Sequence, residues 1–228
     1  MARLSLLGAA GGAVFAIVAV VAFAIAPGPS SGYGPTVVEY YTAHGTAALW
    51  QAVLAGVAVI LFLWFAVTFA EQLSAGPLSI VFASVTAGLL MVTVGATETL
   101  GEVYRHVNFV DVSSESYAAA RVVYDVGDGA GHLARLIGAA YVASTAVAIL
   151  TSTLPRRRLA WIGFALAGLQ LLNAPYQIFA TSHRSAVVGS VVFLAFIVWV
   201  FVLSIVLVLA MRRGTTHSAG ATMFCRAP

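Results

Sequence analysis

Side chains that can bind a ligand, a cation or a proton gather between residues 98 and 135 of this chain. Glu98, Glu102 and His106 recur at four-residue steps, so they share one face if the segment is helical. A second set follows after a short connection: Asp125, Asp128, His132 and Arg135. If each set continues a neighbouring antiparallel helix, two faces that carry carboxylates and a histidine meet at one end of a helix bundle.

Three kinds of chemistry fit this pattern. The first is a polar pocket for a small ligand, cation or proton, lined by Glu98, Glu102, Asp125, Asp128 and Arg135, with Tyr176 from a later segment. The second is a metal centre with His106 and His132 as candidate ligands, although the Glu-x-x-His spacing of di-iron bundles is absent. The third is structural: acids favour a helix N-terminus, and Arg135 pairs with them. No metal is assigned and no cofactor is expected.

The composition requires a lipid environment for most of the chain. Of 228 residues, 61% are hydrophobic and 8% are charged, against about 25% charged residues in a soluble domain. All eleven basic residues are arginines, and they are scattered without an aromatic-interleaved patch, which argues against nucleic-acid binding. The single cysteine, Cys225, excludes an internal disulfide framework and a cysteine-based zinc site.

Hydropathy predicts an all-α membrane protein, a six-transmembrane-helix bundle. A membrane-spanning helix needs about 20 mostly apolar residues, and six segments qualify: 4–26, 46–69, 78–100, 131–154, 159–180 and 186–211. The first segment ends in a pattern that resembles a signal-peptidase site, but its apolar run is longer than a signal core, so we expect it to be retained. Residues 1–213 form one domain in this prediction, and 214–228 form a disordered cytoplasmic tail.

The arginines predict the orientation of the bundle. If six helices are drawn, seven of the eleven arginines fall on one side, including the clusters 156–158 and 212–213. Positive charge accumulates on the cytoplasmic side of membrane proteins. Both termini are therefore expected in the cytoplasm of a bacterial cell, with the protein in the plasma membrane and the acidic 98–135 stretch facing outward.

Three stretches carry a resemblance to a known group of proteins. They are Tyr40-Tyr-Thr-Ala-His44 before Leu61-Phe-Leu-Trp-Phe65, then Ala119 to Asp128, and Pro155-Arg-Arg-Arg-Leu-Ala-Trp-Ile-Gly163. Together they resemble actinobacterial six-helix integral membrane proteins known only as a domain of unknown function. The resemblance covers roughly residues 5–210 and implies a multi-pass plasma-membrane protein, with no activity or ligand attached. It includes Tyr124, Asp125, Gly127 and Asp128 but does not extend to His132.

Three functions remain open from the sequence. The leading interpretation is a multi-pass membrane protein, without enzymatic activity, that binds a small ligand, a cation or a partner in an outward-facing polar pocket. A small transporter or proton-coupled permease is the first alternative, although the predicted midplane is nearly all apolar. A membrane-embedded metal-dependent hydrolase is the second. The expected partners are the lipid bilayer, a small-molecule or cation ligand, and another membrane chain or a second copy; nucleic acid is excluded.

Overall fold

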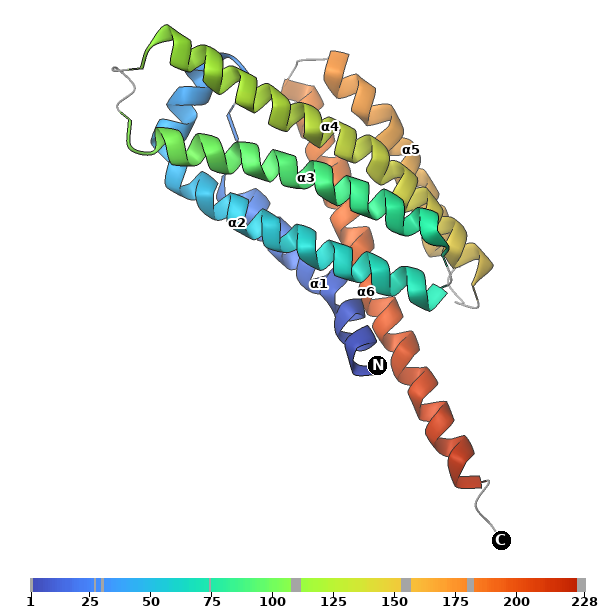
Figure 1. The fold of residues 1–228 in the computed structure, drawn as a ribbon. Coiled ribbons are helices and arrows are strands. Elements are labelled where there is room, and N and C mark those ends of the chain that lie inside the picture. The colour runs from blue at the N-terminus through green and yellow to red at the C-terminus, as the bar shows by residue number, and fades with distance from the viewer. Residues whose placement is uncertain are drawn as a thin grey trace.

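The computed structural model describes residues 2–224 except 27, 30, 74, 108–111, 153–156 and 180–182; side chains are described outside 2–3, 175–186 and 213–224. Over the described residues the only regular secondary structure is helix, with no strand, which confirms the predicted all-α fold (Figure 1). The six helices are α1 (Ala2–Ile25), α2 (Gly34–Leu73), α3 (Pro77–Tyr104), α4 (Ser114–Thr151), α5 (Arg157–Phe179) and α6 (His183–Phe224).

The helices have the length and apolarity of membrane spans. Among the described residues, α1, α2, α3, α4 and α6 each hold a window that is long and apolar enough to cross a membrane, and α5 is not among these five. The protein is therefore membrane-embedded. With 40 and 38 residues, α2 and α4 are about 60 and 57 Å long, twice the ~30 Å thickness of a hydrocarbon core. Both helices must project beyond the lipid.

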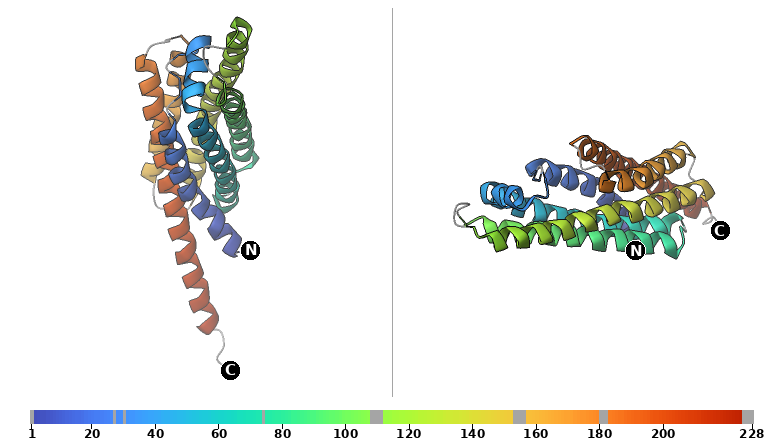
Figure 2. Two further views of the ribbon diagram at one scale, coloured as in Figure 1. Left: turned by 90° about the vertical axis from the view of Figure 1, so that its left-hand side faces the viewer. Right: turned by 90° about the horizontal axis from the view of Figure 1, so that it is seen from above.

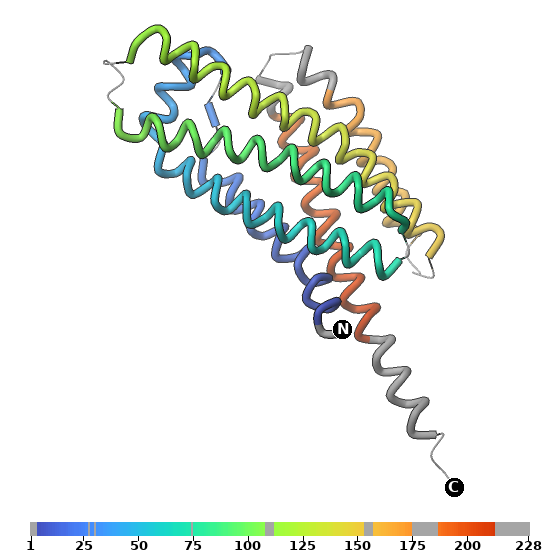
Figure 3. Tube along the Cα trace, in the orientation of Figure 1, coloured from blue at the N-terminus to red at the C-terminus, as the bar shows by residue number. Residues whose placement is uncertain are grey.

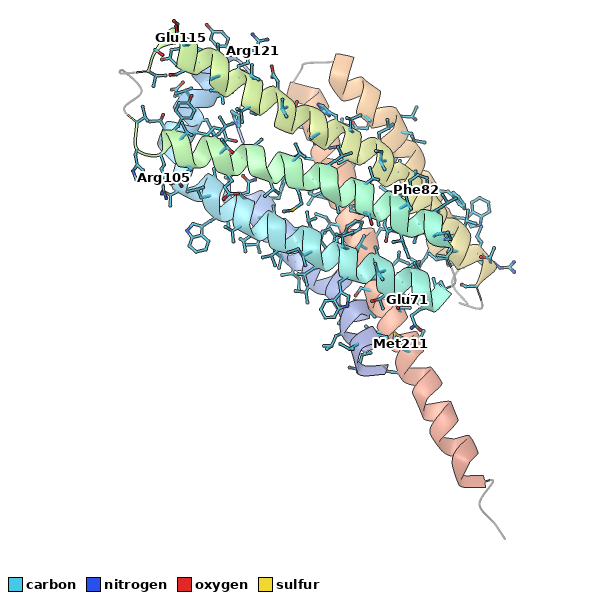
Figure 4. All side chains as sticks on the ribbon, in the orientation of Figure 1. Glu71, Phe82, Arg105, Glu115, Arg121 and Met211 are labelled. Atoms are coloured by element: carbon cyan, nitrogen blue, oxygen red, sulfur yellow. The ribbon has the colours of Figure 1, made fainter. Side chains whose placement is uncertain are left out.

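The projecting parts meet at one end of the bundle, which we call the extended end: residues 34–45 of α2, 98–107 at the end of α3, and 112–130 at the start of α4 (Figures 1 and 2). Close backbone approaches bring them together, because a Cβ on Gly34 would lie 2.5 Å from the Tyr117 carbonyl oxygen and one on Gly45 would lie 3.0 Å from that of Gly101. In Figure 4, Arg105 and Glu115 lie at this end, and Glu71 lies at the opposite end.

Two separate apolar cores hold the helices. The larger, the membrane core, is built on aromatic rings between α1, α2, α4 and α6: Phe62 packs against Phe15, Tyr141 and Phe196 with ring centroids 5.5, 5.2 and 5.9 Å away. The smaller, the extended-end core, comprises Val37, Val38, Tyr41, Ala48, Leu100, Tyr104 and Ala120, with Tyr40, Tyr117 and Tyr124 packed around it. The cores place α2, α3 and α4 side by side over their whole length.

Two features differ from the sequence-based boundaries. The predicted interfacial helix 37–44 and the predicted span 46–69 form one helix, α2, because Gly45 continues the helix while it packs against α3. At the other end of the chain, α6 continues as a helix through Phe224, where a disordered tail from residue 214 is predicted. A single interior glycine costs only about 1 kcal/mol, so Gly214 does not have to end the helix. Figure 3 traces α2 as one continuous helix.

Candidate functional site

The start of α4 positions the acidic residues of the candidate site. Ser113 caps the helix: its side chain accepts a hydrogen bond from the Ser116 backbone N–H at 3.2 Å, and Glu115 lies in the first turn, where the helix dipole favours an acid. Because α4 begins at Ser114 and runs unbroken to Thr151, Asp125 and Asp128 lie on the same rigid helix as the residues deeper in the bundle.

Asp128, His132 and Arg135 form a continuous row on α4. His132 Nε2 lies 3.2 Å from Asp128 Oδ2, and His132 Nδ1 lies 3.3 Å from Arg135 Nη1. A guanidinium can only donate and a carboxylate accepts, so Nδ1 accepts from Arg135 while Nε2–H donates to Asp128. These partners assign a neutral imidazole with its proton on Nε2. A second proton could enter only at Nδ1, and Arg135 would then have to release the ring.

Electrostatics at the mouth of this row favours the charged carboxylate. Asp128 and Tyr124 lie before the predicted span at 131–154. The hydrogen bond from His132 holds the pKa of Asp128 below its usual value, against the opposing effect of burial and with help from the charge of Arg135. Burial, followed by the nearby negative charge of Asp128, raises the pKa of Tyr124 to about 12. At neutral pH the mouth therefore holds a carboxylate beside a neutral phenol.

The row continues into the membrane as a polar stripe on α4: Asp128, His132, Arg135, Gly138, Tyr141 and Thr145, at steps of three or four residues. Neighbours at these steps touch along a helix surface. The stripe winds slowly around α4, because 3.6 residues complete a turn. From Asp128 to Thr145 it covers 17 residues, or about 26 Å, close to the ~30 Å thickness of the hydrocarbon core.

Side chains from α3 and α5 join the stripe at Gly138. A Cβ there would lie 3.6 Å from Thr86 Cγ2 and 4.0 Å from Gln170 Oε1, so the absence of a side chain lets both residues approach. Asn173 follows Gln170 one turn along α5, and both are 5% exposed. We call Thr86, Gln170 and Asn173 the buried polar cluster. Three helices thus present polar groups to the same part of the bundle interior.

Many of these polar groups have no hydrogen-bond partner among the described residues. The orphaned atoms are Ser79 Oγ, Thr86 Oγ1, Tyr141 OH, Thr145 Oγ1, Gln170 Oε1 and both side-chain polar atoms of Asn173. The Tyr141 hydroxyl lies near that of Thr145, one turn on, without forming the geometry of a hydrogen bond. An unpaired polar group costs free energy in an apolar interior, whereas bound water can satisfy it.

The orphaned atoms inside the membrane occur on α3, α4 and α5. Elsewhere in the membrane core the described buried hydroxyls are paired: Thr68 donates to the Trp64 carbonyl at 2.9 Å, and Ser204 donates to the Ala9 carbonyl. Such i−4 and interhelical bonds are the usual way to satisfy a hydroxyl in a membrane helix. The contrast localises the unmet hydrogen-bonding capacity to one interface of the bundle.

The other predicted site residues have different surroundings. Glu98 is exposed on α3, because Ala96, Thr97 and Gly101 occupy the faces that meet α4 and α2. Glu102 pairs with Arg105 at 2.7 Å, and Asp125 pairs with Arg121 at 3.5 Å, so each finds its counter-ion on its own helix. His106 is exposed at the end of α3. The side chain of Tyr176 lies outside the described residues.

The described residues do not assemble a metal site. No group of three His, Cys, Asp or Glu side chains converges among them, and the row supplies only Asp128 and His132. Catalytic zinc sites use at least three protein ligands.

Sequence reasoning missed Thr86 and Gln170 of the buried polar cluster. The available signal was a glutamine inside an apolar segment, Gln170, since uncharged amides are costly in lipid unless another helix or water satisfies them. Comparison with protein-family models, curated proteins and solved structures finds no match to this chain.

Proposed function

We propose that this protein conducts protons across a bacterial plasma membrane along the polar stripe of α4, with both termini in the cytoplasm and the extended end outside. This assignment belongs to the transporter class rather than to the enzymes. The observation that carries it is the stripe itself, which runs from a half-exposed carboxylate just before the predicted span 131–154 through His132 to the buried Thr145 inside that span.

The chemistry of the row suits proton entry. Chains of Asp, Glu and His inside membrane proteins typically form proton relays. Asp128, with its side chain 50% exposed, exchanges protons with water, and His132, with its side chain 17% exposed, gives its Nε2 proton to the Asp128 carboxylate. The carboxylate and the guanidinium of Arg135 balance each other, so the row presents no net charge against a proton. A metal cation would have to shed its water to enter the same space.

Beyond His132 the path requires water. The orphaned hydroxyl and amide atoms of Thr86, Tyr141, Thr145, Gln170 and Asn173 provide acceptors and donors for bound water, which typically makes two to four such bonds. A proton can then pass by exchange of bonds between water and these groups. The neutral tautomer of His132 is suited to this role: once Arg135 releases Nδ1, that nitrogen gains a proton from the inner side and Nε2 loses its proton to Asp128, which carries one proton outward through the ring. Inward conduction follows the same steps in reverse.

The proposal is tested by proton flux into liposomes. The purified protein is reconstituted with a pH-sensitive dye inside the vesicles, and a potassium diffusion potential drives protons inward. We expect faster acidification than in protein-free vesicles, and a loss of about tenfold or more in His132→Gln, in line with the contribution of a positioned proton-transfer group. Asp128→Asn should slow the flux, whereas Asp125→Asn is the matched control, because Asp125 pairs with Arg121 instead.

Two results would contradict the assignment. Wild-type vesicles that acidify no faster than empty ones would remove conduction altogether. A His132→Gln variant that conducts like wild type would remove the stripe as the path.

A further inference from the structure

A pocket at the extended end lies apart from the polar stripe. It has a volume of about 520 Å³ and opens between the end of α1, the stretch 42–50 of α2 and the end of α3. Its lining includes Ile25, His44, Thr46, Trp50 and Arg105. The size lies within the ~300–1,000 Å³ range of small-molecule sites. No residue of this lining belongs to the proposed proton path, so the pocket calls for its own interpretation.

The contact between α2 and α3 builds this pocket. Arg105 lies directly on Gly45: a Cβ at that glycine would come within 2.6 Å of Arg105 Cβ and 3.0 Å of its Cα. Gly101, one turn earlier on α3, approaches the Gly45 carbonyl in the same way, at 3.2 Å. The two glycines therefore let the arginine side chain lie against α2, next to His44 and Thr46, rather than extend into solvent.

Arg105 keeps unused hydrogen-bonding capacity. Its Nη2 donates to Glu102 Oε1 at 2.7 Å, while its Nε is buried and has no partner among the described residues. A guanidinium offers five N–H donors in a fixed planar arrangement that matches the oxygens of a phosphate group. The side chain is 32% exposed, so the charge is partly withdrawn from water, which strengthens its attraction for an anion.

His44 lines the same pocket beside Arg105. Its Nδ1 lies 3.2 Å from the Tyr40 carbonyl oxygen, which can only accept, so Nδ1 carries a proton. Its ring stacks on that of Tyr40 with centroids 4.9 Å apart and planes 20° apart, which fixes its orientation. Nε2 is then the ring nitrogen left for a ligand, and it accepts a hydrogen bond when the ring is neutral.

The depth of the pocket matches the headgroup layer of the membrane. Gln51 donates to the Ala26 carbonyl at 2.8 Å, so the pocket residues just before Gln51 lie level with the end of α1, where that span leaves the lipid. Trp50 is 62% exposed at this level. Exposed tryptophans concentrate at membrane interfaces. Ile25 and Trp50 provide an apolar wall toward the lipid, below the polar donors.

We propose that this pocket binds the phosphate group of an anionic phospholipid, with Arg105 as the donor and the acyl chains running along Ile25 and Trp50. The phosphate chemistry fits inorganic phosphate equally well, and the apolar wall favours the lipid as its source. This inference is independent of proton conduction, since it concerns other residues and a different surface.

Lipid retention by the purified full-length protein tests the proposal. The protein in detergent is incubated with phosphatidylglycerol or with phosphatidylcholine, and bound lipid is counted by native mass spectrometry. We expect preferential retention of phosphatidylglycerol, weakened about tenfold or more in Arg105→Gln, the usual loss for one charge-assisted hydrogen-bonding partner. Arg121→Gln is the matched control, because this exposed arginine lies at the same end and pairs with Asp125 (Figure 4).

A second variant guards against simple misfolding of Arg105→Gln. Glu102→Gln removes the carboxylate that competes for the guanidinium, so it should retain more phosphatidylglycerol than wild type. Equal retention of the two lipids by wild type, or wild-type retention in Arg105→Gln, would overturn the proposal. Displacement of phosphatidylglycerol by inorganic phosphate alone would overturn the lipid as the source and leave a free-phosphate site.

Discussion

The two apolar cores use aromatic residues in different ways. In the extended-end core, tyrosine hydroxyls reach the backbone: Tyr104 donates to the Ser116 carbonyl at 2.9 Å, and Tyr40 accepts from the Gly28 N–H at 3.0 Å. The membrane core is built mainly on phenylalanine rings, and its one described tyrosine, Tyr141, is fully buried with an orphaned hydroxyl.

The difference follows from the solvent around each core. Near water, the ring of a tyrosine buries apolar area, and its hydroxyl forms a hydrogen bond with the backbone of a loop or of the first turn of a helix. The hydroxyl therefore adds stability. Inside the bilayer no free water compensates an unmet hydroxyl, and phenylalanine fills the same space without that cost. Tyr141 departs from this pattern on the same interface that carries the other orphaned polar atoms. Natural proteins typically break a local rule of this kind at functional sites.

The largest expected effect tests whether packing holds the membrane core. Phe62→Ala should lower the free energy of unfolding by about 3–5 kcal/mol, because its ring is 1% exposed and contacts Phe15, Tyr141 and Phe196. Val57→Ala on the lipid-facing side of the same helix should change it by less than about 0.5 kcal/mol. Unfolding in mixed detergent micelles measures both variants. Similar values for the two would mean that this aromatic cluster does not hold the helices together.

A pair of conservative variants compares the two kinds of tyrosine directly. Tyr104→Phe should cost about 1 kcal/mol of stability, because it removes the hydrogen bond from the tyrosine hydroxyl to the Ser116 carbonyl. Tyr141→Phe should be neutral or stabilising, because it removes a hydroxyl without a partner, and it should slow proton flux. Thermal unfolding and the liposome assay on the same preparations check this. A clear loss of stability in Tyr141→Phe would instead indicate a firmly bound water at that hydroxyl.

The smallest effect concerns the pH dependence at the mouth of the stripe. Because the folded-state pKa of Asp128 is lowered, its stabilisation is fully present above the unfolded-state value of about 4 and is lost as the pH falls through the folded-state pKa. The stability difference between wild type and Asp128→Asn should therefore be modest at neutral pH and vanish in acid. In a double-mutant cycle, Asp128→Asn should change the stability of the His132→Gln variant much less than that of wild type. A stability difference between wild type and Asp128→Asn that persists in acid would contradict the assigned hydrogen bond.

The helices were predictable because hydropathy reports the lipid environment directly. The segments 46–69 and 78–100 fall inside α2 and α3, and the all-α fold follows from them. The lengths of α2 and α4 were harder to anticipate, since the polar residues between 112 and 130 read equally well as a loop or as a helix in water. The cap formed by Ser113 and the packing of tyrosines around Tyr104 stabilise the helical form of residues 114–130, and both depend on tertiary contacts.

The candidate site was predictable only along a single helix. The four-residue step from Asp128 to His132 predicted a shared face, and the structure places them in contact. Contacts between helices could not be predicted from the sequence. The packing of Gly101 against Gly45 sets the rotation of α3 about its axis. That rotation turns Glu98 outward and brings Arg105 beside His44. Arg105 and His44 lie 61 residues apart in the chain, and no local pattern links them.

The bond between Ser204 and the Ala9 carbonyl joins the last helix to the first across 195 residues of chain. Helices of a membrane protein leave the ribosome in order, so α1 waits in the bilayer through the synthesis of four others before its partner on α6 arrives. Until then α1 packs mainly against α2. A ribosome that stalls before residue 204 therefore releases a chain in which α1 lacks its hydrogen-bond donor on α6. The uncovered face of α1 is then the feature that cellular quality control has to recognise.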